Sequence, residues 1–129
     1  MNREIMPASI APPAANYAHA VLTEGAGSLL HVSGVVAARP DGTIPDDVAD
    51  QAAVIWVNIG AILAEADMTL ADIVSITTYV VVDFMACLPE VMAARDQALA
   101  GHRAASTLVT VPALARPAWK MEVAVIAAR

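Results

Sequence analysis

The chain has 129 residues, of which 58% are hydrophobic and only 16% charged, so we expect one domain, residues 1–129, with ample side chains for a core. The formal net charge of -6 argues against nucleic-acid binding, which needs a basic face. The single cysteine, Cys87, excludes an internal disulfide, and no Cys/His cluster has metal-binding spacing, so we predict no metal.

No run of eighteen apolar residues is free of polar breaks, and the N-terminus lacks the apolar core of a signal peptide. We therefore expect a cytoplasmic protein that does not contact a membrane. The apolar composition leaves more hydrophobic side chains than one small core needs, which predicts an oligomer.

In the N-terminal half, residues 1–16 are rich in Pro and Ala and are predicted to be extended. Residues 17–23 and 28–33 are predicted strands, joined as a hairpin through the Gly-containing loop 24–27. A helix should begin after Asp46 or Asp47, either of which can cap it. Apolar residues at steps of three and four predict its buried stripe: Val48, Ala52, Ile55, Ile59, Leu63 and Ala66.

The opposite face of this helix is also rather apolar, which fits either tolerance of small apolar residues or a partly covered helix. Thr69 is predicted to cap one short turn, residues 70–72, and the β-branched residues 73–82 form a central strand. Pro89 lies in the first turn of a second helix that ends at Gly101. Residues 106–111 and 119–127 are the closing strands.

The order β-β-α-β-α-β-β predicts an α+β fold, a mixed sheet with two helices on one face. The other face must be covered, and a symmetric oligomer is the simplest cover for so short a chain. Glu122 is a lone acid in the apolar last strand. A part-buried carboxylate there is costly unless it is paired, for example with Lys120 or an arginine of a neighbouring subunit, or used by a ligand.

Six segments carry a family pattern in order, at residues 14–21, 32–34, 45–58, 72–74, 77–80 and 114–123. In sequence and in near-correct spacing they resemble the Rid (RidA/YjgF/UK114) family of small trimeric proteins. Gln51 and Asn58 in the first helix stand at the places expected for that family.

The resemblance implies a homotrimer of the chorismate-mutase-like type, with small-molecule clefts between neighbouring subunits. It implies an enamine/imine deaminase, a hydrolase that converts reactive enamines and imines to keto acids and ammonia without a metal or organic cofactor. The endoribonuclease (L-PSP) activity sometimes attached to the family fits poorly with the acidic charge of this chain.

Carried over by position, the resemblance places the family's catalytic acid on Glu122. It places the cleft tyrosine on Tyr17 and the ligand-contacting glycine on Gly34. All three residue types are retained.

The substrate-binding positions of the second half differ from the family pattern. The carboxylate-binding arginine falls on Ser106, the cysteine two positions later on Leu108, and the asparagine or threonine of the second helix on Met92. Arg103, three residues before Ser106, is our first candidate to replace the missing arginine, and Arg116 is the second. Ser106 can donate a hydroxyl hydrogen bond to a ligand.

Three functions remain open from the sequence. The first is hydrolysis of an enamine or imine that is not a standard substrate or is bound differently. The second is a non-catalytic module that binds a small apolar metabolite, because Ser106, Leu108 and Met92 make the cleft less charged. The third is a pathway-specific lyase or isomerase that uses Glu122 as acid/base.

Overall fold

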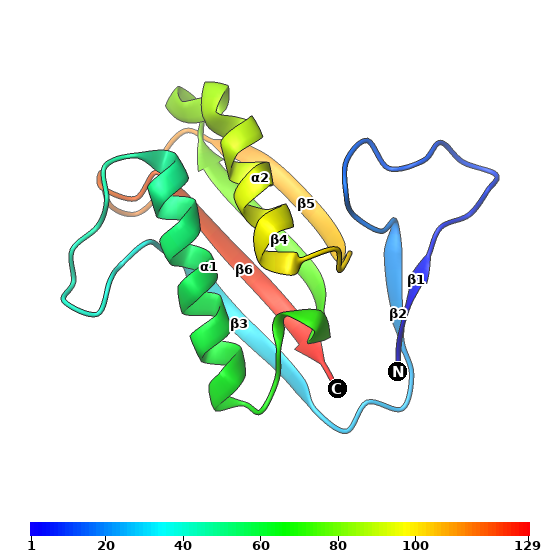
Figure 1. The fold of residues 1–129 in the computed structure, drawn as a ribbon. Helices are drawn as coiled ribbons and strands as arrows, with labels where there is room; N and C mark the ends of the chain where they lie inside the picture. Colours follow the sequence, from blue (N-terminus) through cyan, green and yellow to red (C-terminus); the bar gives the residue numbers. More distant parts are fainter.

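The central sheet has four strands in the order β3-β6-β4-β5, and the computed structural model describes all residues, 1–129 (Figure 1). These strands are β3 (Leu29–Val35), β4 (Ile73–Val81), β5 (Ala105–Val111) and β6 (Met121–Ala128). β4 and β5 run parallel, whereas β6 is antiparallel to both β3 and β4. The predicted mixed sheet is therefore confirmed.

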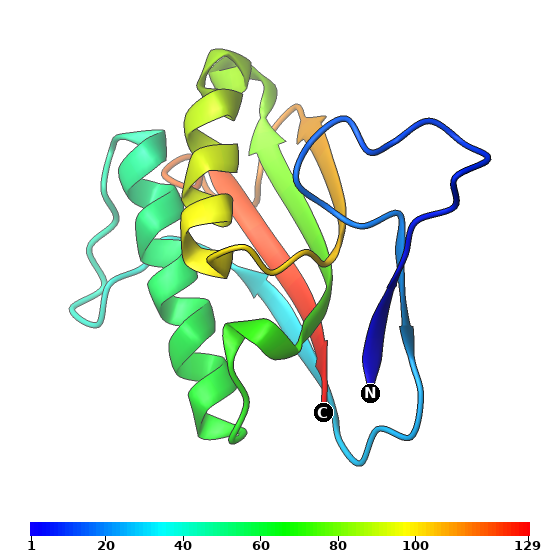
Figure 2. The ribbon, with the colours of Figure 1, turned by 45° about the vertical axis from the view of Figure 1, so that its right-hand side comes forward.

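Two helices, α1 (Val48–Glu65) and α2 (Leu88–Leu99), cover one face of this sheet (Figure 2). Asp47 caps α1, because its carboxylate accepts hydrogen bonds from the backbone of Ala49 and Asp50. The predicted stripe of α1 is buried except at Ala66, and α1 packs mainly on β6 and β3. The core that it joins also contains residues of β4, and its members include Ile55, Ile59, Leu63, Ile76, Val80, Val123 and Val125.

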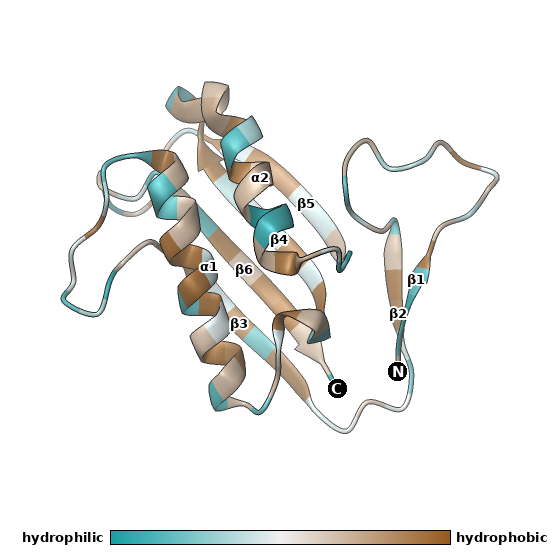
Figure 3. Cartoon of the chain, viewed as in Figure 1, coloured by the Kyte–Doolittle hydropathy of each residue, from teal (hydrophilic) through white to brown (hydrophobic).

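α1 is apolar along much of its surface, as the hydropathy colouring shows (Figure 3). Its 18 residues and mean hydropathy of 1.3 would by themselves suit a membrane span. In this fold it is a core helix, since Ile55, Ile59 and Leu63 have no exposed surface. Val57 on the outer face is 72% exposed, so within one chain nothing covers that side of the helix.

The short turn before β4 and the two ends of α2 lie where the capping and helix-breaking residues predicted them. Thr69 and Asp72 form a capping box around η1 (Leu70–Asp72), as expected for a single capped turn before β4. A second short 3-10 segment, η2 (Val82–Cys87), leads into α2, whose first turn contains Pro89. α2 ends where Ala100 and Gly101 adopt positive φ angles of 49° and 91°.

The predicted hairpin between residues 17–23 and 28–33 is wrong. β2 (Ala20–Thr23) instead pairs with an additional strand, β1 (Asn2–Ile5), which lies within the segment predicted to be merely extended. β3 instead pairs with β6, and this pairing sets apolar residues of the two strands opposite one another, which the hairpin would not do. The backbone N–H groups of Gly27 and Ser28 both donate to the carbonyl of Arg129, which ties this loop to the end of β6.

The β1–β2 ribbon lies beside the main sheet and is not part of it (Figures 1 and 2). Ala18 forms an isolated parallel bridge with Ala105, and Asn2 donates to the carbonyl of Ala128. Arg103 is ion-paired with Glu4 of β1. The ribbon is therefore attached at the end of the sheet where β5 begins and β6 finishes.

The face of the sheet away from the helices is built from the alternate residues of each strand. No helix covers it in the single chain (Figure 2). Most of its side chains are small, β-branched or half-buried, and the central ones are Ser75, Thr77, Tyr79, Thr107, Val109, Glu122, Ala124 and Ile126. We call this surface the open face.

Candidate functional site

Glu122 and Gly34 meet at one end of the open face. Glu122 is half-buried on β6, opposite Tyr79 of β4, and Gly34 lies on β3 within a register shift between Val32 and Val35. A Cβ atom built on Gly34 would lie only 1.7 Å from Oε1 of Glu122. The carboxylate can therefore occupy this position only because residue 34 has no side chain.

The carboxylate of Glu122 has no hydrogen-bond or ion-pair partner within the chain. The two salt bridges are Arg95–Asp96 and Arg103–Glu4. Lys120, its predicted structural partner, instead donates from Nζ to the carbonyl of Asp46, with Nζ 4.9 Å from the ring centre of Phe84. Glu122 is thus held by packing beside Gly34 while its oxygens remain available to a ligand or to a neighbouring subunit.

Gln51 fixes the segment that leads into Glu122. Its buried side chain donates from Nε2 to the carbonyls of Pro45 (2.8 Å) and Ala118 (3.0 Å). Its Oε1 accepts a hydrogen bond of 3.1 Å from the backbone N–H of Lys120. One side chain of α1 therefore holds both the entry to its own helix and the start of β6, two residues before Glu122.

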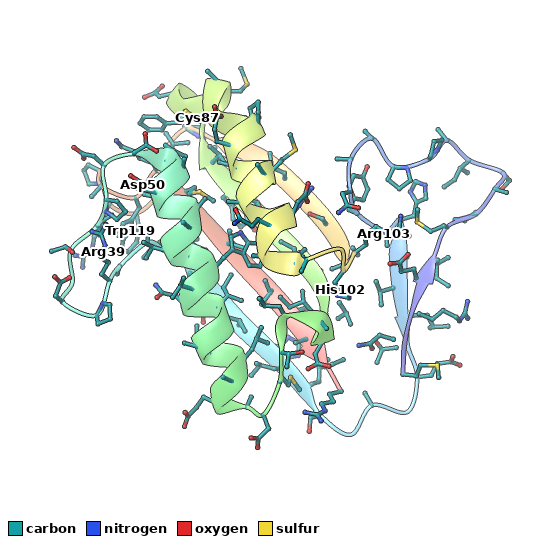
Figure 4. All side chains as sticks on the ribbon, in the orientation of Figure 1. Arg39, Asp50, Cys87, His102, Arg103 and Trp119 are labelled. Atoms are coloured by element: carbon teal, nitrogen blue, oxygen red, sulfur yellow. The ribbon has the colours of Figure 1, made fainter.

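Tyr17 and Arg103 lie at the opposite end of the sheet. Tyr17 is half-buried next to Ala18, which bridges to Ala105 at the start of β5. Figure 4 shows Arg103 between β5 and the β1–β2 ribbon, where it donates to both carboxylate oxygens of Glu4 at 2.7 and 3.3 Å. Counted along the paired strands, Arg103 is six residues from the level of Glu122, about 20 Å.

Ser106 and Met92 belong to neither group, because they lie on the helix side of the sheet. Ser106 is opposite Ile76, whose side chain is buried under the helices, so it points away from the face that carries Glu122. Met92 of α2 and Leu108 of β5 line a small cavity between helix and sheet. Thr107 and Val109, not Ser106, are the β5 residues on the open face.

Arg95 of α2 also lines this cavity, and the sequence analysis did not single it out. Its Nη1 lies 3.5 Å from Oγ of Ser106. The spacing of the residues in α2 could have indicated that Arg95 is buried. It stands between Val91 and Leu99 at steps of four, on the buried stripe of the helix. Burying a charge is costly, so a buried cation at this position is a candidate for a functional role.

Arg116, the second candidate cation, lies over the ring of Trp119, with 5.4 Å between the guanidinium carbon and the ring centre. Both line a surface hollow of about 470 Å³ formed by the connections after β4 and between β5 and β6. Elsewhere, no three His, Cys, Asp or Glu side chains gather in a metal-binding arrangement.

The sequence profile of the family described as Endoribonuclease L-PSP matches residues 8–129 of this chain. No curated protein sequence matches it significantly. Solved structures do match. YyfB of the Rid family from Yersinia pestis, a protein of unknown function, has 30% sequence identity and a TM-score of 0.90, covering 99% of this chain and 98% of that protein.

Two further structures match over nearly their whole length. Rv2704 from Mycobacterium tuberculosis, of the YjgF/YER057c/UK114 family, has 26% identity and a TM-score of 0.70, with 100% of both chains covered. TdcF from E. coli, solved with bound serine, has 26% identity and a TM-score of 0.72, covering 98% of this chain and 99% of that one. Both the profile match and the fold match extend over almost all of the chain, and it therefore belongs to the Rid/YjgF/UK114 family, the endoribonuclease L-PSP family.

Proposed function

We propose that this protein is a cytoplasmic homotrimer that hydrolyses enamines or imines to carbonyl compounds and ammonia, in clefts between its subunits, without a metal or organic cofactor. One observation carries the proposal. The half-buried Glu122 carboxylate, free of any ion pair in the chain, lies against a glycine that leaves room for it. A carboxylate kept free in this way suits acid/base chemistry.

The positions of the candidate residues support a location between subunits. Glu122 and Gly34 are at one end of the open face, Arg103 is about 20 Å away at the other, and Tyr17 lies at that same far end, next to Ala18. A single small substrate cannot reach both groups in one chain. Packing of open faces in a symmetric oligomer can bring one group of each subunit to the other group of its neighbour.

The chemistry needs only one proton-transferring group. The enamine tautomerises to an imine, water adds to the imine carbon, and the C–N bond then breaks to give a carbonyl and ammonia. A Glu122 oxygen takes a proton from the attacking water and gives it to the imine nitrogen, which forms a carbinolamine. It then takes the hydroxyl proton of the carbinolamine and gives it to the departing nitrogen, so that ammonia leaves and the carboxylate is regenerated. TdcF, which is similar to this chain, was solved with bound serine, and this supports a substrate of amino-acid size.

A second candidate function is binding of a ligand without turnover. It is favoured by the residue types on the helix side of the sheet. Met92 and Leu108 are partly buried apolar residues on that side, and β5 carries no arginine. This candidate predicts retention of a small apolar metabolite that does not depend on the charge of Glu122.

The deciding experiment is ammonia release from enzymatically generated 2-aminoacrylate and from a bulkier imino acid. We expect acceleration over buffer by the wild-type protein and its loss in Glu122→Gln, which removes the charge with little change of shape. Glu65→Gln, at the exposed end of α1, is the matched control and should keep full activity. Equal rates for wild type and Glu122→Gln would reject Glu122 as the acid/base, and no acceleration at all would favour the binding module.

A further inference from the structure

The outer surface of the helix layer carries an apolar groove between α1 and α2. Its free volume is about 450 Å³, which is within the range of pockets that bind ligands. None of its eight lining residues is charged, and six are hydrophobic. The groove opens to solvent, because Ala53, Val57 and Gln97 in its lining are exposed. It therefore lies on the opposite side of the protein from the open face.

Small residues on the two helices leave this space empty. Gly60 of α1 and Ala94 and Ala98 of α2 line the groove, and nothing lies within 4 Å of a Cβ atom built on Gly60. Trp56 forms part of its wall and is only 5% exposed, whereas Val57 is 72% exposed. An apolar side chain as exposed as Val57 is stabilised when a partner removes it from water.

The length of the groove fits two turns of a helix. Along α1 its lining extends from Ala53 to Gly60, seven residues or about 10 Å. α1 and α2 pack side by side, and a groove between two helices accepts the side-chain ridges of a third. On that third helix, apolar side chains at i, i+3 or i+4, and i+7 extend over the same distance.

The charges on the surface of the helix layer are all acidic. The only cation within α1, η1 and α2 is Arg95, which is buried, and the acids are Asp50, Glu65, Asp72, Glu90 and Asp96. Asp50 and Glu90 precede Ala53 and Ala94 of the groove by one helical turn. Both helices begin at the same end of the layer, so these two acids lie at one end of the groove (Figures 1 and 2).

This charge pattern distinguishes between possible occupants. A second copy of the chain would bring the same acids against these acids, and an anionic membrane would also be repelled. A basic segment would be attracted. We propose that the groove binds an amphipathic helix of another protein, with apolar side chains in the groove and lysines or arginines beside Asp50 and Glu90. This binding does not depend on the reaction proposed for Glu122.

The test uses a synthetic helical peptide with leucines at steps of three and four on one face and lysines on both sides of that stripe. A second peptide has the same composition, but its leucines share no face. Trp119→Phe leaves Trp56 as the only tryptophan, so that its fluorescence reports on the groove. We expect the first peptide to change this fluorescence and to bind roughly tenfold more tightly than the second.

Two variants test the groove by calorimetry with the first peptide. Gly60→Leu fills the space and should weaken binding roughly tenfold or more. Ala61→Leu adds the same side chain at an exposed neighbour that does not line the groove, and it should bind like wild type. Val57→Gln removes the exposed apolar edge without adding bulk, and it should also weaken binding even if Gly60→Leu folds poorly.

A matched pair of variants tests the charges. Glu90→Gln should weaken binding of the first peptide roughly two- to fivefold at low salt. Glu24→Gln removes an exposed acid next to β2, away from the helix layer, and should leave the affinity unchanged.

Equal affinity of wild type, Gly60→Leu and Val57→Gln for the first peptide would overturn the proposal, and so would equal binding of the two peptides. Two further results would overturn it by identifying another occupant. A wild-type protein that sediments as a larger species than Gly60→Leu would mean that a second copy fills the groove. Binding of phosphatidylcholine vesicles by wild type but not by Gly60→Leu would identify a membrane surface.

Discussion

The room at Gly34 determines where the Glu122 carboxylate can lie. Gly34→Ala would place a methyl group within 1.7 Å of Oε1 and 2.9 Å of Cγ in the present arrangement. The obstacle is the end of a flexible side chain, so we expect the carboxylate to be displaced and the fold to be retained. Ammonia release should fall towards the level of Glu122→Gln, with a melting temperature close to that of wild type.

Gly60→Ala is the matched control, because nothing lies within 4 Å of the Cβ it would add on α1. It should keep full activity and gain up to about 1 kcal/mol of stability, since alanine is the better helix former. Full activity in Gly34→Ala would show that the Glu122 position described here is not the one used.

For single residues of the candidate site, the sequence predicted some positions and missed others. Glu122 stands out as an acid in an apolar strand, but its contact with Gly34 depends on a register shift in β3 that no local pattern signals. Ser106 and Glu122 lie on opposite faces of the sheet, which spacing between two strands that are not adjacent cannot reveal. Arg95 was overlooked because a single charge in an amphipathic helix is usually solvated.

Among the elements, those with strong local signals were predicted closely. α1 has a capping aspartate and a regular apolar stripe, and α2 has a proline at its start and a glycine after its end. The failed hairpin shows the limit, because its two strands each found a partner distant in the sequence. Strand pairing is decided by the whole sheet, and a glycine-containing loop alone does not determine it.

The clamp made by Gln51 links α1 to β6, and its removal should be costly. In Gln51→Leu the side chain keeps much of its volume, but two carbonyls and the N–H of Lys120 lose their partner. We expect a loss of about 3 kcal/mol or more in the free energy of unfolding, measured with urea. A change below 1 kcal/mol would mean that water replaces the amide at all three groups.

For the whole molecule, the open face is the surface that a single chain leaves without a cover. Ala124 lies near its centre, half-buried on β6 and opposite Thr77. Ala124→Lys should split the proposed trimer of 13.3-kDa chains, because an interface core tolerates an unpaired charge poorly. Sedimentation should then report a smaller species, and ammonia release should be lost with it. A trimer that survives this change would place the interface elsewhere.

Glu122 lies at one end of the open face and Tyr17 lies at the other, beside the start of β5, so a small substrate cannot reach both within one chain. Two inactive proteins should therefore complement each other. When Glu122→Gln and Tyr17→Ala chains are unfolded together and reassembled, random mixing should give about one quarter of the clefts an intact acid and an intact tyrosine from different subunits. If each parent protein is inactive and activity appears on mixing, each active cleft must be built from residues of two different subunits.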